Sequence, residues 1–160
     1  IEKMDYRYKT YDYSRFPNHK ETYTRIRNSL LEYKGICTVI HGDPVFTNIL
    51  INDYGKIKYI DMRGKIGTTL TIYGDEMYDW AKLYQSLIGY DEILEDKTLN
   101  SAYKTQMCNS FLSYLRELYP NRMDTDFSML KIITQCLLFS LIPLHDNEKC
   151  EQYYRLIDIL

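Results

Sequence analysis

The side chains best suited to catalysis lie between His41 and Asp61, in the stretch HGDPVFTNILINDYGKIKYID. Asp43 follows His41 by two residues and precedes Asn48 by five (48 − 43 = 5). A carboxylate and an amide at this spacing suit phosphoryl transfer, in which the Asp accepts a hydroxyl proton and the Asn holds Mg²⁺. Asp61 could supply a second metal ligand. A surface loop closed by Asx turns is the alternative explanation of the same residues.

Short strands must position these side chains. Apolar runs at 36–40, 49–51 and 57–60 are separated by Gly, Pro, Asn and Asp, which predicts strands joined by tight turns. Residues 49–52 and 57–60 should pair as a hairpin. Asn48 enters one strand and Asp61 leaves its partner, so both are expected at the same open end. An amide oxygen and a carboxylate are ligands that Mg²⁺ prefers.

Three ordered segments, HGDPVFTNIL, YIDMRG and YGDEMYDWAKL, resemble the aminoglycoside phosphotransferase and choline kinase family, small-molecule relatives of protein kinases. The resemblance implies that Asp43 is the catalytic base and that Asn48 and Asp61 bind Mg²⁺ and, through it, the nucleotide. It implies that His41 braces the loop and that a buried Asp79 anchors the backbone of that loop.

The chain departs from the family pattern in two places. Met62-Arg63 replaces the more common aromatic-Gly pair after the metal-binding aspartate, and the segment between Asp61 and Asp75 is longer than expected. Arg63 has two interpretations: its guanidinium could steady a phosphate, or it could pair with a nearby carboxylate.

The fold implied by the resemblance is α+β: the mainly helical C-terminal lobe of the protein-kinase-like fold, with a small catalytic β-hairpin. Residues 1–160 should form one domain. No glycine-rich phosphate loop is recognisable, because GKIGTT lacks P-loop spacing. The nucleotide-binding lobe is therefore expected upstream as a partner of this lobe, and the isolated chain is expected to be inactive.

The implied function is ATP- and Mg²⁺-dependent phosphorylation of a hydroxyl on a small molecule, such as a sugar, an aminoalcohol or an aminoglycoside. The alternative is a non-catalytic kinase-like module kept for binding or scaffolding. A protein kinase fits less well, because the loop reads Gly42-Asp43-Pro44 and no peptide-docking activation segment is recognisable.

Composition argues against three other classes of protein: nucleic-acid-binding, membrane-spanning and zinc-binding. The net charge of −2 offers no basic face for nucleic acid. The longest apolar run, 136–144, is interrupted by Ser140 and Pro143, so no membrane span is expected. The four cysteines lie far apart without a CxxC pair, which favours buried thiols in a reducing, cytoplasmic compartment over a zinc site.

Helical periodicity predicts the rest of the architecture. The expected helices cover 19–33, 75–88, 99–119, 126–142 and 148–160. The fourth is apolar nearly all round, so it should be the buried centre of the bundle, with Leu137 in the core.

Three other segments carry weaker signals. The tyrosine-rich residues 1–16 are expected to be an extended segment or a linker. Residues 63–74 are expected to be a loop, either an active-site flap near the acceptor hydroxyl or a solvated turn. The acidic run 91–96 is expected to be a solvated turn, with the alternative that it holds a cationic acceptor.

Overall fold

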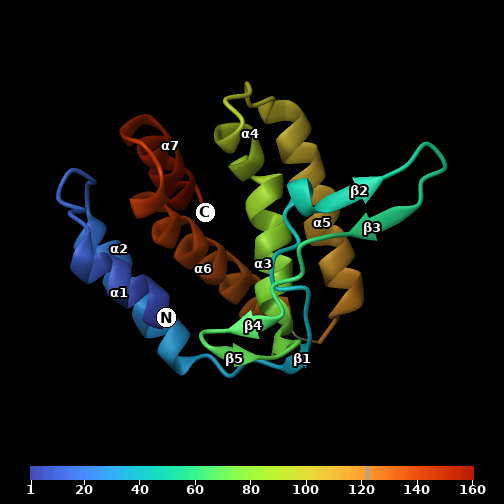
Figure 1. Cartoon of the computed structure of the whole chain (residues 1–160), viewed down its shortest axis with the longest axis horizontal. Helices are drawn as coiled ribbons and strands as arrows, with labels where there is room; N and C mark the ends of the chain where they lie inside the picture. The colour runs from blue at the N-terminus through green and yellow to red at the C-terminus, as the bar shows by residue number, and fades with distance from the viewer. Residues whose placement is uncertain (122) are drawn as a thin grey trace.

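The computed structural model describes residues 1–121 and 123–160, and its architecture is α+β (Figure 1). The helices are α1 (Glu2–Thr10), α2 (His19–Glu32), α3 (Glu76–Leu87), α4 (Tyr90–Leu94), α5 (Ser101–Leu118), α6 (Met123–Leu141) and α7 (Asn147–Asp158). Short 3₁₀ turns, η1 (Phe46–Asn48) and η2 (Ile142–Leu144), precede β2 and α7. The strands are β1 (Cys37–Val39), β2 (Ile49–Ile51), β3 (Ile57–Tyr59), β4 (Lys65–Ile66), β5 (Thr69–Leu70) and β6 (Tyr73–Asp75).

Helix α6 is the centre of the bundle, as its apolar sequence predicts. It contacts α1, α2, α3 and α7, and Figure 1 shows it crossing between α2 and α3. Leu130, Leu138 and Phe139 on this helix are buried. Leu137 is only half-buried, which corrects its expected place in the core. Its neighbour Leu138 faces the interior instead.

Two groups of buried side chains meet at α6. One joins α1, α2, α6 and α7 around Met4, Ile26 and Phe139. The other joins α3, α5 and α6 around Met77 and Leu115. One helical stretch among the described residues, Phe127–Leu144, is long and apolar enough to cross a membrane by length and composition, but half of it is buried inside the protein. A core helix has this same composition.

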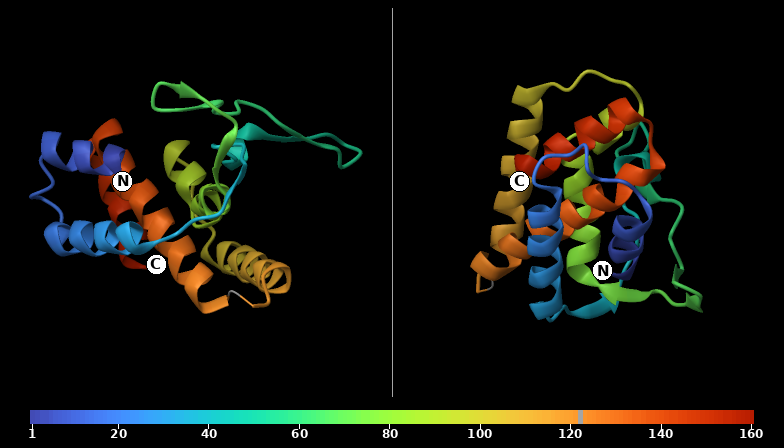
Figure 2. Two further views of the ribbon diagram at one scale, coloured as in Figure 1. Left: turned by 90° about the horizontal axis from the view of Figure 1, so that it is seen from below. Right: turned by 90° about the vertical axis from the view of Figure 1, so that its left-hand side faces the viewer.

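The strands form three separate antiparallel pairs rather than one sheet. Ile49 pairs with Tyr59 and Ile51 with Ile57, which confirms the hairpin expected at 49–60. The run 36–40 supplies β1, which pairs with β6 and not with that hairpin. The third pair, β4 with β5, lies in the segment expected to be a loop. Figures 1 and 2 both show the β2–β3 hairpin projecting away from the helices.

Glycine turns explain why residues 63–74 are more ordered than a loop. Gly64 and Gly67 have φ of 63° and 57°, a left-handed conformation that favours glycine. These turns let the β-branched residues at Ile66 and Thr69 pair across a tight hairpin.

The N-terminal segment also differs from the expectation. Residues Glu2–Thr10 form a helix, whose Met4 is fully buried. Glu, Lys, Arg and Met favour helix, and the density of tyrosines obscured that signal. Tyr13, just beyond the helix, stacks on Phe139 with ring centroids 4.5 Å apart, so this segment belongs to the core rather than to a linker.

The acidic run 91–96 is not a simple solvated turn. Tyr90–Leu94 form the short helix α4, in which Asp91 and Ile93 are buried. Gly89 starts this helix with a φ of 122°. The four cysteines are free thiols, but Cys37 is exposed and only Cys150 is fully buried, so the expectation of buried thiols is correct for one of the four.

Candidate functional site

The loop between β1 and η1 is held by a carboxylate on α3. Asp79 accepts hydrogen bonds from the backbone amides of His41 (2.7 Å) and Gly42 (2.8 Å). These contacts confirm the expected anchor between Asp79 and the loop backbone. The side chain is half-buried rather than buried, which corrects one part of that expectation. A carboxylate with two charge-assisted bonds to adjacent amides fixes the loop's direction.

The start of α3 places Asp79 next to this loop. Asp75 caps the helix by accepting from the amide of Met77 at 3.1 Å, and β6, which leads into it, pairs with β1. The strand that enters the loop and the helix that anchors it are therefore tied together. Burial raises the pKa of Asp75, and the hydrogen bonds from Met77 and Tyr33 oppose that rise.

Gly42 allows the chain to turn between His41 and Asp43. Its φ is +83°, and a Cβ added there would lie 2.8 Å from the Cβ of Arg63. The amide of Arg63 donates to the carbonyl of His41 at 2.9 Å, so the segment after β3 packs directly on the loop. Glycine is required here by backbone conformation and by space.

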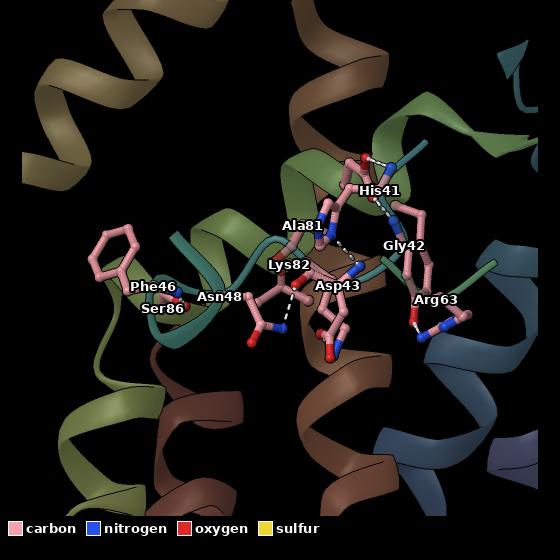
Figure 3. A network of polar contacts seen from close by, with 12 residues as sticks. His41, Gly42, Asp43, Phe46, Asn48, Arg63, Ala81, Lys82 and Ser86 are labelled. Carbon is pink, nitrogen blue, oxygen red and sulfur yellow. Dashed lines mark hydrogen bonds and ion pairs between the residues drawn. The ribbon is translucent and has the colours of Figure 1, made fainter. Parts of the chain in front are cut away.

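Asp43 forms an ion pair that its sequence position does not reveal. Its Oδ1 lies 3.0 Å from Nζ of Lys82 on α3, and the Lys82 side chain is only 11% exposed. Oδ1 itself is buried, whereas the Asp43 side chain as a whole is 39% exposed. Oδ1 therefore faces the Lys82 ammonium while part of the Asp43 side chain remains exposed, and Figure 3 shows Asp43 beside Lys82.

Asn48 is oriented by the same loop. Its Nδ2 donates to the carbonyl of Asp43 at 2.9 Å, and Figure 3 shows its amide oxygen directed away from Asp43. Its own carbonyl accepts from the amide of Ile60 at 3.0 Å. Because Nδ2 is engaged with the backbone, the side-chain oxygen is left to act as an acceptor or as a cation ligand.

Asp61 follows Ile60 directly and is exposed. Its φ is +58°, a left-handed conformation that few residues other than glycine adopt, although Asp and Asn adopt it more readily. Two backbone-anchored steps, Asp43 to Asn48 and Asn48 to Ile60, thus bring the three expected residues into one neighbourhood. Strained backbone of this kind concentrates at functional sites.

His41 lies inside the loop rather than facing outward. Its Nδ1 accepts a long hydrogen bond from the amide of Asp43 at 3.3 Å, and its ring lies 5.7 Å from that of Tyr59. A bracing role requires a contact of this kind. Its Nε2 is buried and has no hydrogen-bond partner among the described residues.

Metal binding at this site would depend on few protein ligands. Among the described residues, no three His, Cys, Asp or Glu side chains gather as a metal-binding group. The expected set is smaller, with one amide oxygen from Asn48 and one carboxylate from Asp61. This donor chemistry fits Mg²⁺, which retains waters and phosphate oxygens in its shell.

An apolar cavity of about 400 Å³ lies behind the loop. It is lined by Val39, Ile40, His41, Pro44, Tyr59, Met62, Asp79, Trp80 and Leu83. Asp43, Asn48 and Asp61 are not among these residues, so the cavity is distinct from the place where the three polar side chains gather.

Several buried polar residues near the loop were missed by sequence reasoning. Ser86 Oγ accepts from the amide of Phe46 at 3.1 Å, and the Ser86 carbonyl accepts from Nζ of Lys104 at 3.2 Å. Lys104 also pairs with Glu92. Asp91 is 7% exposed, and its carboxylate lacks a hydrogen-bond partner among the described residues.

One signal could have revealed Lys82. It lies three residues after Asp79 (82 − 79 = 3), so the two side chains share a helix face. The anchor and the cation that meets Asp43 therefore come from the same surface of α3. No comparable signal identified Ser86 or Lys104, whose roles depend on tertiary packing.

Comparison with known proteins gives no match, because no family model, no curated protein and no solved structure is significantly similar to this chain.

Proposed function

We propose that this chain is the mainly helical catalytic lobe of a kinase-like small-molecule phosphotransferase. The reaction would be ATP- and Mg²⁺-dependent transfer of a phosphoryl group to an alcohol. The observation that carries this proposal is at Asp43, whose Oδ1 is buried beside Lys82 although 39% of its side chain is exposed. A base needs a fixed orientation and a side that the acceptor hydroxyl can approach.

The roles of the other residues follow from their contacts. Asp79 holds the His41 and Gly42 amides, so Asp43 stays in place as the hydroxyl approaches. The bond from Asn48 Nδ2 to the Asp43 carbonyl leaves the Asn48 side-chain oxygen available to a cation, and the backbone bond from the Ile60 amide to the Asn48 carbonyl brings the next residue, Asp61, into the same neighbourhood. Mg²⁺ bound there would neutralise charge on the nucleotide phosphates. Positioning and electrostatics supply most of the catalysis in phosphoryl transfer.

Exposed apolar side chains support the expectation of a second lobe. Several large hydrophobic residues of the β segment are at least 50% exposed, among them Leu50, Ile51, Ile57, Tyr59 and Met62. A nucleotide-binding lobe would cover part of such a face. The same exposure favours the alternative function, a kinase-like module that binds a partner without catalysis.

The test measures turnover and Mg-ATP binding separately in the full-length protein. Asp43→Asn should reduce phosphorylation of a responsive acceptor by about 10²- to 10⁴-fold, as expected for loss of a general base, with Mg-ATP affinity nearly unchanged. Asp61→Asn should weaken Mg-ATP binding and lose activity with it. Asp53→Asn, at an exposed turn position, controls for the loss of one carboxylate.

A panel of sugars, aminoalcohols and aminoglycosides with labelled ATP would identify the acceptor class. If Asp43→Asn abolished Mg-ATP binding while Asp61→Asn left it intact, the base and the ligand would be reversed. If Mg-ATP bound and no acceptor were phosphorylated, the non-catalytic alternative would be favoured.

A further inference from the structure

Cations from different elements surround the candidate base. Lys82 of α3 already neutralises Asp43, with Nζ and Oδ1 3.0 Å apart. Arg63, which follows β3, packs its Cβ against Gly42, the residue immediately before Asp43. Figure 3 shows the Arg63 side chain beside the loop that carries Gly42 and Asp43. A ligand that approaches Asp43 therefore meets an arginine at the edge of the loop.

The charge of Arg63 is not compensated by a carboxylate. Its guanidinium lies 4.7 Å from the ring centroid of Tyr78 and donates to the Tyr78 hydroxyl. Within the described part of the chain it forms no ion pair, which answers the question left open by the sequence. The contacts with Tyr78 hold the guanidinium, and because Arg63 is exposed its other N–H donors can bind a carboxylate or a phosphate.

Lys3, near the start of α1, adds a further cation. Helix α1 is fixed on the bundle, because Met4 is buried and Arg7 donates to the Ser140 carbonyl. Its N-terminal end is directed toward the centre of the molecule (Figures 1 and 2). Burial lowers the pKa of Lys3, as do the positive charges of Arg7, Arg63 and Lys82, while Asp43 opposes this shift. Lys3 forms no ion pair with the described residues, so its positive charge is available to attract an anionic ligand.

The acidic segment offers no matching site for a cation. Three of its carboxylates are paired with lysines: Glu92 with Lys104, Glu95 with Lys97, and Asp96 with Lys149. The fourth carboxylate of the segment, Asp91, is buried. A positively charged acceptor would therefore find occupied carboxylates there and like charges beside Asp43.

We propose that the acceptor alcohol carries an anionic group, a phosphate or a carboxylate, which binds between Arg63 and Lys3 while its hydroxyl lies at Asp43. This inference rests on the proposed phosphotransfer and specifies its substrate class. Lys82 remains with Asp43 and does not bind the acceptor anion. The paired donors of Arg63 give orientation, and Lys3 supplies charge at longer range.

Direct binding measurements test the proposed anion site without relying on turnover. Glycerol 3-phosphate, as an anionic alcohol, and choline, as a cationic one, are titrated into labelled protein and followed by amide NMR shifts. Glycerol 3-phosphate should shift the amides of Lys3, Gly42 and Arg63, and choline should not. The double variant Lys3→Gln/Arg63→Gln should weaken glycerol 3-phosphate binding by about tenfold or more, as loss of charge-assisted hydrogen bonds predicts.

A matched control separates this site from general charge attraction. Lys20→Gln/Lys56→Gln removes the same two charges at exposed positions outside the cluster and should leave the titration unchanged. Equal weakening in both double variants would overturn the proposal. So would choline shifting the same amides, or glycerol 3-phosphate binding as tightly to the Lys3→Gln/Arg63→Gln variant as to the parent.

The nucleotide is the other source of phosphate, and calorimetry of Mg-ATP on the full-length protein distinguishes it. If the Lys3→Gln/Arg63→Gln variant lost Mg-ATP affinity and retained glycerol 3-phosphate affinity, the cations would belong to the nucleotide site and the proposal would fail. Asp43→Asn should retain glycerol 3-phosphate binding. A protein that bound this anion at Arg63 but transferred no phosphoryl group would refute the proposed function while supporting the anion site.

Discussion

The β segment at 36–75 and the helical bundle are held together in opposite ways. In the bundle, large side chains such as Leu138 and Phe139 are fully buried. In the β segment, Leu70 is 85% exposed and Ile51 67% exposed, and the strands form three separate pairs. Hydrophobic burial therefore stabilises the helices, whereas the residues of the candidate site are positioned by a few polar contacts with α3.

Those polar contacts are specific and few. Asp79 holds His41 and Gly42, Lys82 meets Asp43, and Ser86 accepts from Phe46. All three anchoring residues lie on one helix, so α3 transmits the rigidity of the bundle to the loop. This division suits a catalytic site, whose geometry can be tuned by single contacts while the fold keeps its stability.

The largest effect is expected in the bundle. Leu138→Ala on α6 should lower the free energy of unfolding by about 2–5 kcal/mol, because a fully buried leucine leaves a cavity when truncated. Leu70→Ala, the same change at an exposed strand position, should alter it by less than about 0.5 kcal/mol. Urea unfolding followed by circular dichroism measures both. Similar losses for the two variants would contradict the contrast in burial.

The next effect should be local rather than global. Asp79→Ala removes the acceptor of two backbone amides, so the loop should open without unfolding the helices. Hydrogen exchange at the His41 and Gly42 amides should accelerate by about 10- to 100-fold, as expected for bonds to a charged acceptor. Amides of α6 should retain their protection, which provides the internal control. Uniform acceleration through both regions would show that the loop and the bundle unfold as one unit.

A smaller effect is expected at Gly42. Gly42→Ala forces a side chain into a left-handed backbone and into the Cβ of Arg63, and should destabilise the protein by about 2 kcal/mol. Gly55→Ala shares the positive φ of +74° but has no atom within 4 Å of the added Cβ, so it should cost about 1 kcal/mol from conformation alone. Thermal unfolding of both variants measures the difference. Equal losses would mean that Arg63 moves aside and does not pack firmly on the loop.

The local motifs were predictable from sequence because neighbouring residues determine them. The hairpin at 49–60 follows from two short apolar runs separated by a turn that contains Gly55, and α3 from an Asp cap and helical periodicity. The anchoring by Asp79 was inferred through the family resemblance and is present in the structure.

Long-range contacts could not be predicted in the same way. The helix at Glu2–Thr10 is stabilised by packing against residues more than a hundred positions away, such as Ser140. The pairing of β1 with β6 spans the whole site, and the meeting of Lys82 with Asp43 depends on where α3 lies against the loop. Spacing along α3 places Lys82 on the same face as Asp79, but local patterns do not determine such long-range contacts.

The smallest effect concerns the buried carboxyl group of Asp91 and the pH dependence of stability. Burial raises the pKa of Asp91, as does the neighbouring Glu92, while Ser86 and Lys104 oppose the shift. Because the folded protein favours the protonated acid, its contribution to stability is complete below the ordinary value of 3.8 and is lost as the pH rises through the raised folded pKa. Asp91→Asn cannot ionise, so its stability relative to the parent should increase across that window and then level off. Urea unfolding of both proteins from acid to neutral pH measures this difference, with Asp53→Asn at an exposed position as the control for the loss of one charge. A difference that stayed constant with pH, or that fell toward neutrality, would show that Asp91 is better paired with Lys104 than its burial indicates.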